Sequence, residues 1–408
     1  MRTNVLVLFS FCVYAESMES LVQKQSRLGL VKPLPYNPML VPPKHRGAAG
    51  QGAGGLANDY RGRGARSNVS SRHEKLKRNV FDDGWQVYES APKLKTKVTE
   101  EKAKSIISKN KSPDLWFDYT VNPYRGCEHG CVYCYARPSH ANLGLSPGLD
   151  FEAKLFAKTN AGDVLRATFC KKNYQPKTIM LGGNTDIYQP IERQYRITRQ
   201  ILEVALEFSH PIALVTKSAS IVRDLDLLKQ LAAKNLVKVA ISITSLDHKL
   251  SRSLEPRASQ PAKRLQAMEI LSNAGIPTSA LIAPIIPAVN DHEIEKILGA
   301  VSVAGAREAA FIMLRLPAEV RPQFKEWLMA EMPDRAARVI SLMRSVHNGK
   351  DYDSSFGQRR TGTGPYAWSV ARRFELTAKR LKLNLRKIEL DTKSFKRPVQ
   401  VGGQLPLL

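Results

Sequence analysis

The sequence predicts an α/β protein whose core is a partial (β/α) barrel of the TIM type. Short apolar segments alternate with amphipathic stretches through the middle of the chain, and 408 residues suffice for one large domain with extensions, or for two domains. Strands separated by helices pair in parallel, and functional groups then gather at the carboxyl ends of the strands. A flat doubly wound sheet has the same alternation and remains the competing topology.

The elements of this core follow from hydrophobic periodicity. The expected strands are 177–181, 212–216, 237–243, 278–285 and 309–314. The expected helices between them are 192–208, 220–233, 261–274 and 291–304. The first of these helices has apolar residues at helical spacing, at Ile197, Ile201, Ala205 and Phe208. Asp291 is the expected N-cap of the last helix.

Composition divides the chain into four regions: a basic low-complexity arm (1–78), a transitional segment (79–112), the core (113–320) and a basic helical C-terminal extension (321–408). The arm is Pro-rich and then Gly-rich, and we expect it to be largely disordered. Its segment Arg61-Gly-Arg-Gly-Ala-Arg66 resembles arginine–glycine stretches that contact RNA, although a solvated tail is the alternative.

The C-terminal extension is expected to hold helices at 324–330 and 335–346 and a Gly-rich turn at 361–364. At the other end, residues 5–15 form an apolar run that is too short to span a bilayer. We interpret that run as a mis-assigned start or an irrelevant extension rather than a signal peptide, and we expect a cytoplasmic protein without a membrane partner.

The net charge is +25 and the isoelectric point is about 9.9. A field of this sign attracts polyanions and raises their rate of encounter, so nucleic acid bound through the basic arms is a candidate partner. The alternative is that the basic tails only aid solubility.

Three of the five cysteines, Cys127, Cys131 and Cys134, lie within eight residues in the pattern C-x3-C-x2-C. This clustering is typical of a metal site in a reducing compartment and not of a disulfide framework. Three thiolates would hold a [4Fe–4S] cluster and leave one iron open for a substrate or cofactor. A structural zinc site with His129 or His140 as fourth ligand is an alternative, and a redox pair of Cys131 and Cys134 is another.

The longer motif is more specific. The string Asn122-Pro-Tyr-Arg-Gly-Cys127, continued by Tyr133-Cys134-Tyr-Ala-Arg137 and later by Gly182-Gly-Asn-Thr-Asp186-Ile-Tyr-Gln-Pro190, resembles the radical S-adenosylmethionine (SAM) superfamily. Within it the string is similar to the branch related to spore photoproduct lyase, the DNA-repair-photolyase-like proteins. The likeness covers about residues 116–316.

That resemblance implies a radical SAM enzyme, related to lyases, whose open cluster iron binds SAM. It also implies an electron donor such as flavodoxin or ferredoxin, because SAM is cleaved reductively to methionine and a 5′-deoxyadenosyl radical. It does not name the substrate. The runner-up function is a non-catalytic, zinc- or cluster-stabilised nucleic-acid-binding protein.

The resemblance also assigns cofactor contacts. Tyr133 would pack near the adenine of SAM, although a buried structural tyrosine is the alternative. Gly182, Gly183 and Asn184 occupy the position of a motif that binds the SAM amino group, with Asn184 in place of a glutamate. An amide oxygen still accepts a hydrogen bond from an ammonium group, and Asp186 could add the negative charge, so either residue is a candidate.

Three further residues follow expected strands or begin loops. Lys217 is expected to pair with the SAM carboxylate or the substrate, Ser242 to meet ribose oxygens, and Arg257 to bind an anion bidentately. Ordinary strand-end polar residues and a surface salt bridge are the alternatives. Spore photoproduct lyase returns hydrogen to its product through a cysteine, but we interpret Cys170 as a packed core residue and carry no role over to it.

Overall fold

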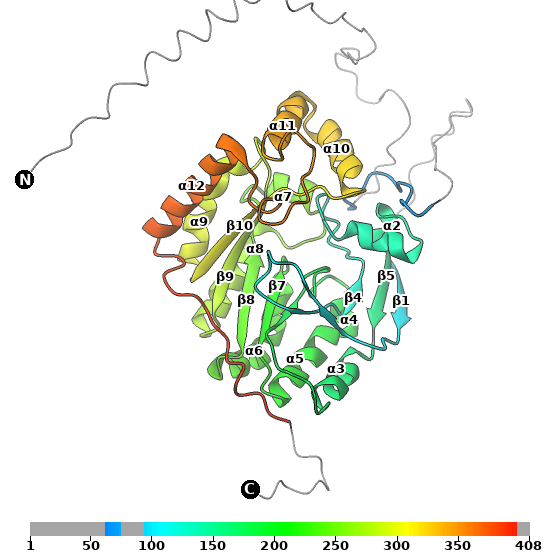
Figure 1. Ribbon diagram of the computed structural model, residues 1–408, viewed down its shortest axis with the longest axis vertical. Helices are drawn as coiled ribbons and strands as arrows, with labels where there is room; N and C mark the ends of the chain where they lie inside the picture. The colour runs from blue at the N-terminus through cyan, green and yellow to red at the C-terminus, as the bar shows by residue number, and fades with distance from the viewer. Residues whose placement is uncertain (1–61, 75–93, 398–408) are drawn as a thin grey trace, which may run out of the picture. The chain divides into compact units, whose positions relative to one another are not determined.

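The structure is a computed structural model that describes residues 62–74 and 94–397. Its centre is a seven-stranded sheet in the order β10-β9-β8-β7-β6-β3-β2 (Figure 1). The pairs from β10 to β3 are parallel, and β2 is antiparallel to β3 at one edge. The strands are β2 Ile107–Lys109, β3 Tyr119–Val121, β6 Ile179–Leu181, β7 Ile212–Thr216, β8 Val237–Ser242, β9 Thr278–Ile285 and β10 Glu308–Met313. The prediction of an α/β fold with a parallel sheet is confirmed.

Helices connect the parallel strands and bury one face of the sheet. They are α3 Ala161–Phe169, α5 Ile197–Glu207, α6 Leu225–Ala233, α8 Pro261–Asn273 and α9 Ile294–Val303. Aliphatic residues of these helices and of the strands form one large apolar core, in which Leu202, Leu228 and Leu298 are fully buried. Burial of this continuous surface is the main stabilising contribution to the fold. In the described part of the chain the two edge strands, β10 and β2, do not pair with each other, so the sheet is open.

Three expected helices differ from the structure at their starts. The first is split into α4 (Glu192–Tyr195) and α5 by Arg196, whose φ of 51° is left-handed. The second begins with a 3-10 turn, η3 (Ala219–Asp224), before α6. The third begins with another, η4 (Asp291–Glu293), before α9. The prediction that Asp291 is an N-cap is therefore wrong, because its carboxylate instead accepts a hydrogen bond from the Tyr366 hydroxyl.

A small second sheet, in the order β1-β5-β4, carries the cysteine motif. Its strands are β1 Lys97–Glu101, β4 Tyr124–Arg125 and β5 Lys154–Lys158. The chain leaves β4, passes through the three cysteines, and returns through η2 (Arg137–Leu143) and α2 (Leu149–Ala153) to β5. The cysteine loop is therefore anchored at both ends in one sheet, since β4 and β5 pair with each other.

The C-terminal part is integral to the fold. It contains α10 Val320–Glu331, α11 Pro333–Ser345 and α12 Gly364–Arg380, while α7 (His248–Leu254) precedes α8. Helix α12 lies beside α9 (Figure 1), and its Val370 and Phe374 join the main apolar core. The expected helices at 324–330 and 335–346 are confirmed. The helical character ends at Arg380, however, and residues 381–397 form no further helix.

Residues 62–74, which we name the strap, pack against the cysteine loop. The Arg63 guanidinium donates to the carbonyl oxygens of Glu152 at 2.7 Å and Leu94 at 2.8 Å. Gly64 lies so close to Gly130 that a Cβ atom would stand 1.6 Å from the Gly130 carbonyl oxygen. Arg66 pairs with Glu331 of α10. The prediction of a disordered arm is thus wrong for the strap, and these arginines bind their own chain.

The rest of the arm, including residues 5–15 and Cys12, lies outside the described residues. All described residues belong to one unit, Gly55–Leu408. Within the described ranges, every helix is too short or too polar to cross a membrane.

Candidate active site

A cavity of about 190 Å³ lies at the carboxyl ends of the parallel strands, beneath the cysteine loop. We name it the cofactor cavity. Most of the site residues expected from the sequence line it: Cys127, Cys131, Tyr133, Cys134, Gly182, Asn184, Asp186, Lys217 and Ser242. These residues come from the cysteine loop and from the ends of β6, β7 and β8, which is the edge where parallel strands bring distant polar residues together.

The cysteine loop is held by a buried arginine. Arg137 is fully buried, pairs with the fully buried Glu152, and donates to the carbonyl oxygens of Cys131 at 3.0 Å and Gly130 at 3.2 Å. Gly130 has a left-handed φ of 68°, and a Cβ atom there would stand 2.8 Å from the Glu152 carboxylate. The loop conformation is therefore fixed by packing and hydrogen bonds from behind.

The three thiols are unpaired; Cys127 and Cys131 are buried, with 7% and 8% exposure, and Cys134 is partly buried. Burial raises the pKa of all three, so the free thiols are protonated at neutral pH and would release protons on binding a metal. A tetrahedral zinc site requires its ligands around one ion. In the described ranges, no three His, Cys, Asp or Glu side chains are grouped closely enough to hold a single metal ion.

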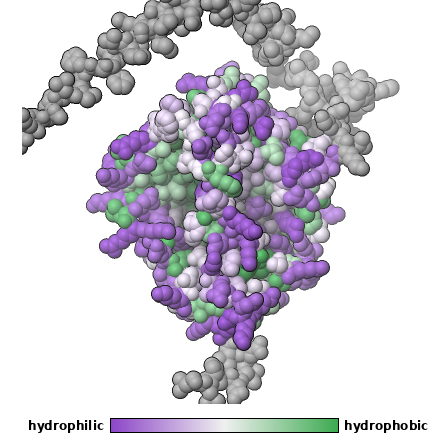
Figure 2. Space-filling view, viewed as in Figure 1, coloured by the Kyte–Doolittle hydropathy of each residue, from purple (hydrophilic) through white to green (hydrophobic). Residues whose placement is uncertain are grey.

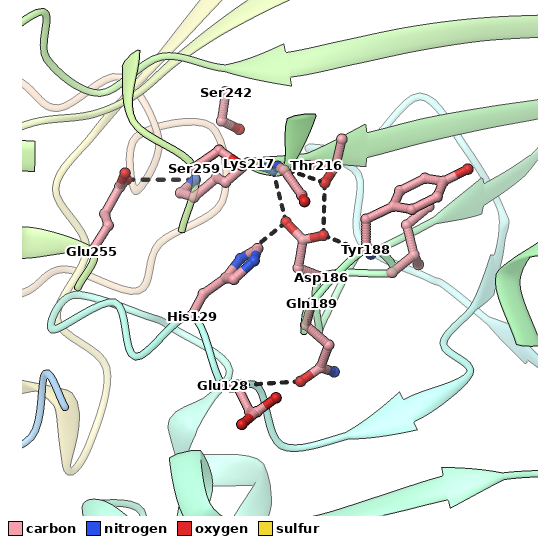
Figure 3. A network of polar contacts seen from close by, with 12 residues as sticks. Glu128, His129, Asp186, Tyr188, Gln189, Thr216, Lys217, Ser242, Glu255 and Ser259 are labelled. Atoms are coloured by element: carbon pink, nitrogen blue, oxygen red, sulfur yellow. Dashed lines mark hydrogen bonds and ion pairs between the residues drawn. The ribbon is translucent and has the colours of Figure 1, made fainter. Parts of the chain in front are cut away.

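The Asp186 carboxylate contacts four other residues around the cofactor cavity (Figure 3). One carboxylate oxygen accepts from the Thr216 hydroxyl at 2.7 Å and the Tyr188 amide at 2.9 Å. The other accepts from the Lys217 amide at 2.7 Å and lies 3.3 Å from Nδ1 of His129 in the cysteine loop. Burial opposes ionisation of Asp186, but these partners outweigh burial and hold its pKa well below the usual range. The carboxylate thus ties β6, β7 and the cysteine loop together.

Asn184 differs from Asp186 in having no such partners. Its side chain lines the cofactor cavity and forms no hydrogen bond with a described residue, while its backbone amide donates to Asn122 at 2.9 Å. Of the two candidates for an amino-group contact, Asn184 has the free acceptor oxygen and Asp186 has its acceptors filled. Gly182 lines the same cavity, whereas the carbonyl oxygen of Gly183 accepts from the Tyr135 hydroxyl and Gly183 lines a neighbouring cavity.

A second polar network lies behind the lining residues Tyr133 and Lys217 and does not itself line the cavity. Glu255 is fully buried, pairs with the buried Arg264, and accepts hydrogen bonds from the hydroxyls of Tyr133 and Thr244. Burial alone would raise the pKa of Glu255, but Arg264 and Lys217 lower it to about 2. The Lys217 ammonium lies 4.0 Å from this carboxylate and 5.9 Å from the Tyr133 ring centroid. Tyr133 is thus both buried and part of the cavity wall.

Of the two remaining residues expected to bind the cofactor, Ser242 lines the cavity and Arg257 does not. The buried Ser242 lines the cavity at the end of β8, and its carbonyl oxygen accepts from Arg264 at 3.0 Å. Arg257 does not line the cavity, because its guanidinium pairs with Glu128 at 3.2 Å, beside the first cysteine. The structure has a salt bridge at Arg257, the kind of contact considered as the alternative, but its partner Glu128 is buried and not on the surface. Cys170 is exposed at the end of α3, so its interpretation as a packed core residue is wrong.

Two functional candidates were missed from the sequence. Arg264 lies on α8, nine residues after Glu255, and only the fold brings the two side chains into contact. Arg315 follows β10 directly and lines the cofactor cavity. The rule that assigns polar residues at strand ends, which singled out Lys217 and Ser242, would also have found Arg315.

Comparison with known proteins agrees with this geometry. The family model of the radical SAM superfamily matches residues 121–301. An uncharacterized protein of Mycobacterium tuberculosis is 35% identical over 240 residues, which cover 58% of this chain and 71% of the relative. An uncharacterized protein of Methanocaldococcus jannaschii is 31% identical over 207 residues, covering 50% of this chain and 73% of the relative.

Among solved structures, a variant of spore photoproduct lyase superposes with a TM-score of 0.51 at 16% identity, covering 70% of this chain and 79% of that chain. Spore photoproduct lyase complexed with dinucleoside spore photoproduct gives the same TM-score and coverage at 15% identity. At these identities the likeness concerns the fold alone.

The matched region contains the cysteine loop and strands β6, β7 and β8, whose ends line the cofactor cavity, but not β10. Membership of this family implies SAM and an iron–sulfur cluster as cofactors, and members generally need a reductant. The cysteine motif, the open parallel sheet and the sequence relatives agree, and the chain belongs to the radical SAM superfamily as a radical SAM enzyme.

Proposed function

We propose that Cys127, Cys131 and Cys134 hold a [4Fe–4S] cluster with one open iron and that SAM binds beside it in the cofactor cavity. The observation that carries this proposal is the convergence of three thiols, two buried and one partly buried, with Asn184, Lys217 and Ser242 in one cavity. When bound, the cluster supplies the electron that cleaves SAM reductively and yields a 5′-deoxyadenosyl radical.

Each protein group has a definite part in this proposal. The free amide oxygen of Asn184 accepts a hydrogen bond from the SAM amino group, and the Lys217 ammonium faces the SAM carboxylate. Ser242 offers its hydroxyl to ribose oxygens, and Tyr133 packs against the adenine. Asp186 and His129 act as positioning residues, because they hold the Lys217 backbone against the cysteine loop. The apolar lining excludes water from the radical.

The zinc alternative has less support. A structural zinc needs four ligands around one ion, and His140, one candidate fourth ligand, is buried with Nε2 bonded to the Lys154 carbonyl oxygen at 2.9 Å. The other candidate, His129, is paired with Asp186.

Nucleic acid, or a component of it, is the substrate class we propose. The net charge of +25 favours a polyanionic partner, and a solved spore photoproduct lyase of the same fold is complexed with a dinucleoside spore photoproduct. An electron donor of the flavodoxin or ferredoxin type would supply the reductant. The Arg–Gly strap is not part of this argument, because its arginines pair within the chain.

The test is anaerobic reconstitution of the full chain. We expect about four iron and four sulfide per chain, and release of 5′-deoxyadenosine from SAM after reduction with dithionite. The Cys131→Ser variant should lose the cluster absorbance and cleave no SAM, because one of three ligands is gone. The matched control is Cys170→Ser, whose thiol is exposed at the end of α3 and should leave both readouts unchanged. A colourless protein with stoichiometric zinc would contradict the proposal.

A further inference from the structure

A second cavity, of about 690 Å³, opens beside the cofactor cavity on the inner face of the sheet. We name it the substrate cavity. The two cavities share Tyr135, Val215, Leu281, Ile312 and Arg315 in their linings. Lys238, Ala240 and Ser279 place the substrate cavity toward the amino ends of β8 and β9. Figure 2 shows the molecule hollowed over these strands, with pale and green residues inside a purple rim.

The lining of the substrate cavity is strongly cationic. Among the described lining residues there is one acidic side chain, Glu308, against the cations Lys109, Lys238, Arg315, Arg359 and Arg360. Two of these cations have acidic partners, since Lys238 lies 3.8 Å from Glu308 and Arg359 pairs with Asp114 at 2.5 Å. The other three cations are Lys109, which is exposed, and Arg315 and Arg360, which are partly buried.

Neither Arg315 nor Arg360 forms an ion pair with a described carboxylate. Nε of Arg315 is buried without a hydrogen-bond partner, and the guanidinium lies 5.4 Å from the Tyr135 ring centroid. Arg360 donates to the carbonyl oxygen of Asp114 at 2.5 Å. Its own carbonyl oxygen accepts from the Met313 amide at 2.8 Å, two residues before Arg315, so the two arginines are held on neighbouring backbones.

The energetics of this arrangement are unfavourable without a ligand. Burial lowers the pKa of Arg360 and the charge of Arg315 lowers it further, while the charge of Asp114 only partly offsets them. Two like charges in a half-buried wall destabilise each other, and an incomplete set of hydrogen bonds around a guanidinium costs additional free energy. A bound anion would remove both costs, and a doubly charged phosphate matches two guanidinium groups better than a single carboxylate does.

Another part of the cavity lining is apolar and aromatic. Leu115, Trp116 and Phe117 line it, and the Trp116 and Phe117 rings meet edge to face at 5.4 Å. Trp116 is 50% exposed, although large aromatic side chains are usually buried. The Lys238 ammonium lies 4.3 Å from its ring centroid. A half-exposed indole at a cavity wall is a surface on which a flat ring can stack.

We propose that the substrate cavity binds an organic phosphate, with its phosphate group on Arg315 and Arg360 and a flat apolar ring against Trp116. A volume of about 690 Å³ is within the range of small-molecule sites. The shared wall at Tyr135 and Arg315 sets this ligand next to the cofactor cavity. Its identity as the substrate of the radical reaction rests on the proposed function, but its binding does not.

The experiment measures binding of three probes to the full, reconstituted chain by isothermal titration calorimetry. The probes are phenyl phosphate, inorganic phosphate and benzyl alcohol. We expect phenyl phosphate to bind at least about tenfold more tightly than either of the others. Arg360→Gln should weaken phenyl phosphate about tenfold and leave benzyl alcohol unchanged, since it removes one charged hydrogen-bond donor. Trp116→Ala should weaken phenyl phosphate and leave inorganic phosphate unchanged.

The matched control is Arg321→Gln, which removes an exposed arginine of α10 outside both cavities and should change no probe. SAM affinity of Arg360→Gln, measured by equilibrium dialysis, should equal that of the unmodified protein, because Arg360 lines only the substrate cavity. Equal binding of phenyl phosphate and benzyl alcohol would overturn the phosphate assignment, and so would an Arg360→Gln variant that binds phenyl phosphate normally. Since these readouts need no SAM cleavage, they separate this inference from the proposed function.

Discussion

The cofactor cavity and the substrate cavity share part of their lining, but they differ in whether their charged side chains form ion pairs. At the cofactor cavity the buried charged groups are paired: Asp186, in the lining, with His129 and backbone amides, and Glu255, behind Tyr133, with Arg264. In the lining of the substrate cavity neither Arg315 nor Arg360 forms an ion pair with a described carboxylate, although the Asp114 charge acts on Arg360. The first wall is complete before any ligand binds, whereas the second is incomplete without an anion. Preorganised polar groups suit a cofactor that every turnover uses, and uncompensated charge suits selection of a ligand.

The strongest way to break this comparison is to remove one cation from the network behind the cofactor cavity and one from the lining of the substrate cavity. Arg264→Met leaves the buried Glu255 carboxylate without its main partner and should lower the free energy of unfolding by about 3–5 kcal/mol. Arg360→Gln should leave the free energy of unfolding unchanged or raise it, because it relieves repulsion with Arg315. Urea unfolding followed by circular dichroism measures both.

Arg166→Met is the control for this pair of variants. It breaks an exposed ion pair with Glu207, which is worth about 0–1 kcal/mol. If Arg264→Met cost no more than this control, or if Arg360→Gln were as destabilising as Arg264→Met, the two cavities would not differ as described.

The second prediction concerns whether Asp186 holds the end of β7 against the cysteine loop at the cofactor cavity. In Asp186→Asn, the amide cannot accept from Thr216, Tyr188 and Lys217 together, so the end of β7 should move away from the cysteine loop. We expect SAM affinity to fall about 100-fold in equilibrium dialysis, while phenyl phosphate affinity changes less than about threefold. Asp226→Asn, which alters an exposed partner of Arg199, should change neither value. Parallel losses for both ligands would mean that Asp186 supports the whole fold.

The smallest expected effect concerns His210, which lines neither cavity and should affect only the stability of the fold. His210 lies before β7, at the amino end of the sheet, stacked on Phe169 at 4.3 Å and bonded to the Tyr174 hydroxyl at 2.8 Å. Burial lowers its pKa to about 3, below the unfolded value, so its contribution to stability is present above the unfolded pKa and is lost as the pH falls. From about pH 7.5 to about pH 5 this amounts to about 2 kcal/mol.

Urea unfolding at these two pH values, compared between the unmodified chain and His210→Gln, measures the effect. The variant should lose about 2 kcal/mol of the pH dependence, and the loss should be the same with or without phenyl phosphate. An unchanged pH dependence in His210→Gln would show that other groups account for the acid sensitivity.

Much of the cofactor cavity could be predicted from the sequence because its residues are adjacent in the chain or end a strand. Cys127, Cys131 and Cys134 are local, and Asn184, Lys217 and Ser242 follow apolar strands whose carboxyl ends meet at one edge. Periodicity also gave the bounds of β7 and β9 correctly, because their apolar runs are short and end at polar or turn residues.

Local composition failed where long-range contacts decide the outcome. The Arg–Gly segment has the composition of a disordered arm, yet Glu152, Glu326 and Glu331, far along the chain, bind the strap. Arg257 has the chemistry of an anion site, but Glu128 lies beside it and takes that interaction. A partner that is distant in sequence leaves no local signal, and its charge can convert a predicted ligand contact into a structural one.

The sequence by itself determined the family, the cysteine motif and the alternation of strands and helices, because all three depend on the spacing of residues that are close together in the chain. Only the tertiary structure decided which charges are neutralised by one another and which remain for a ligand. The pairing of Arg264 with Glu255, and the lack of a described acidic partner at Arg315 and Arg360, depend on how loops and strand ends meet in space. Electrostatic energies vary with distance and burial, and neither quantity is fixed until the chain has folded.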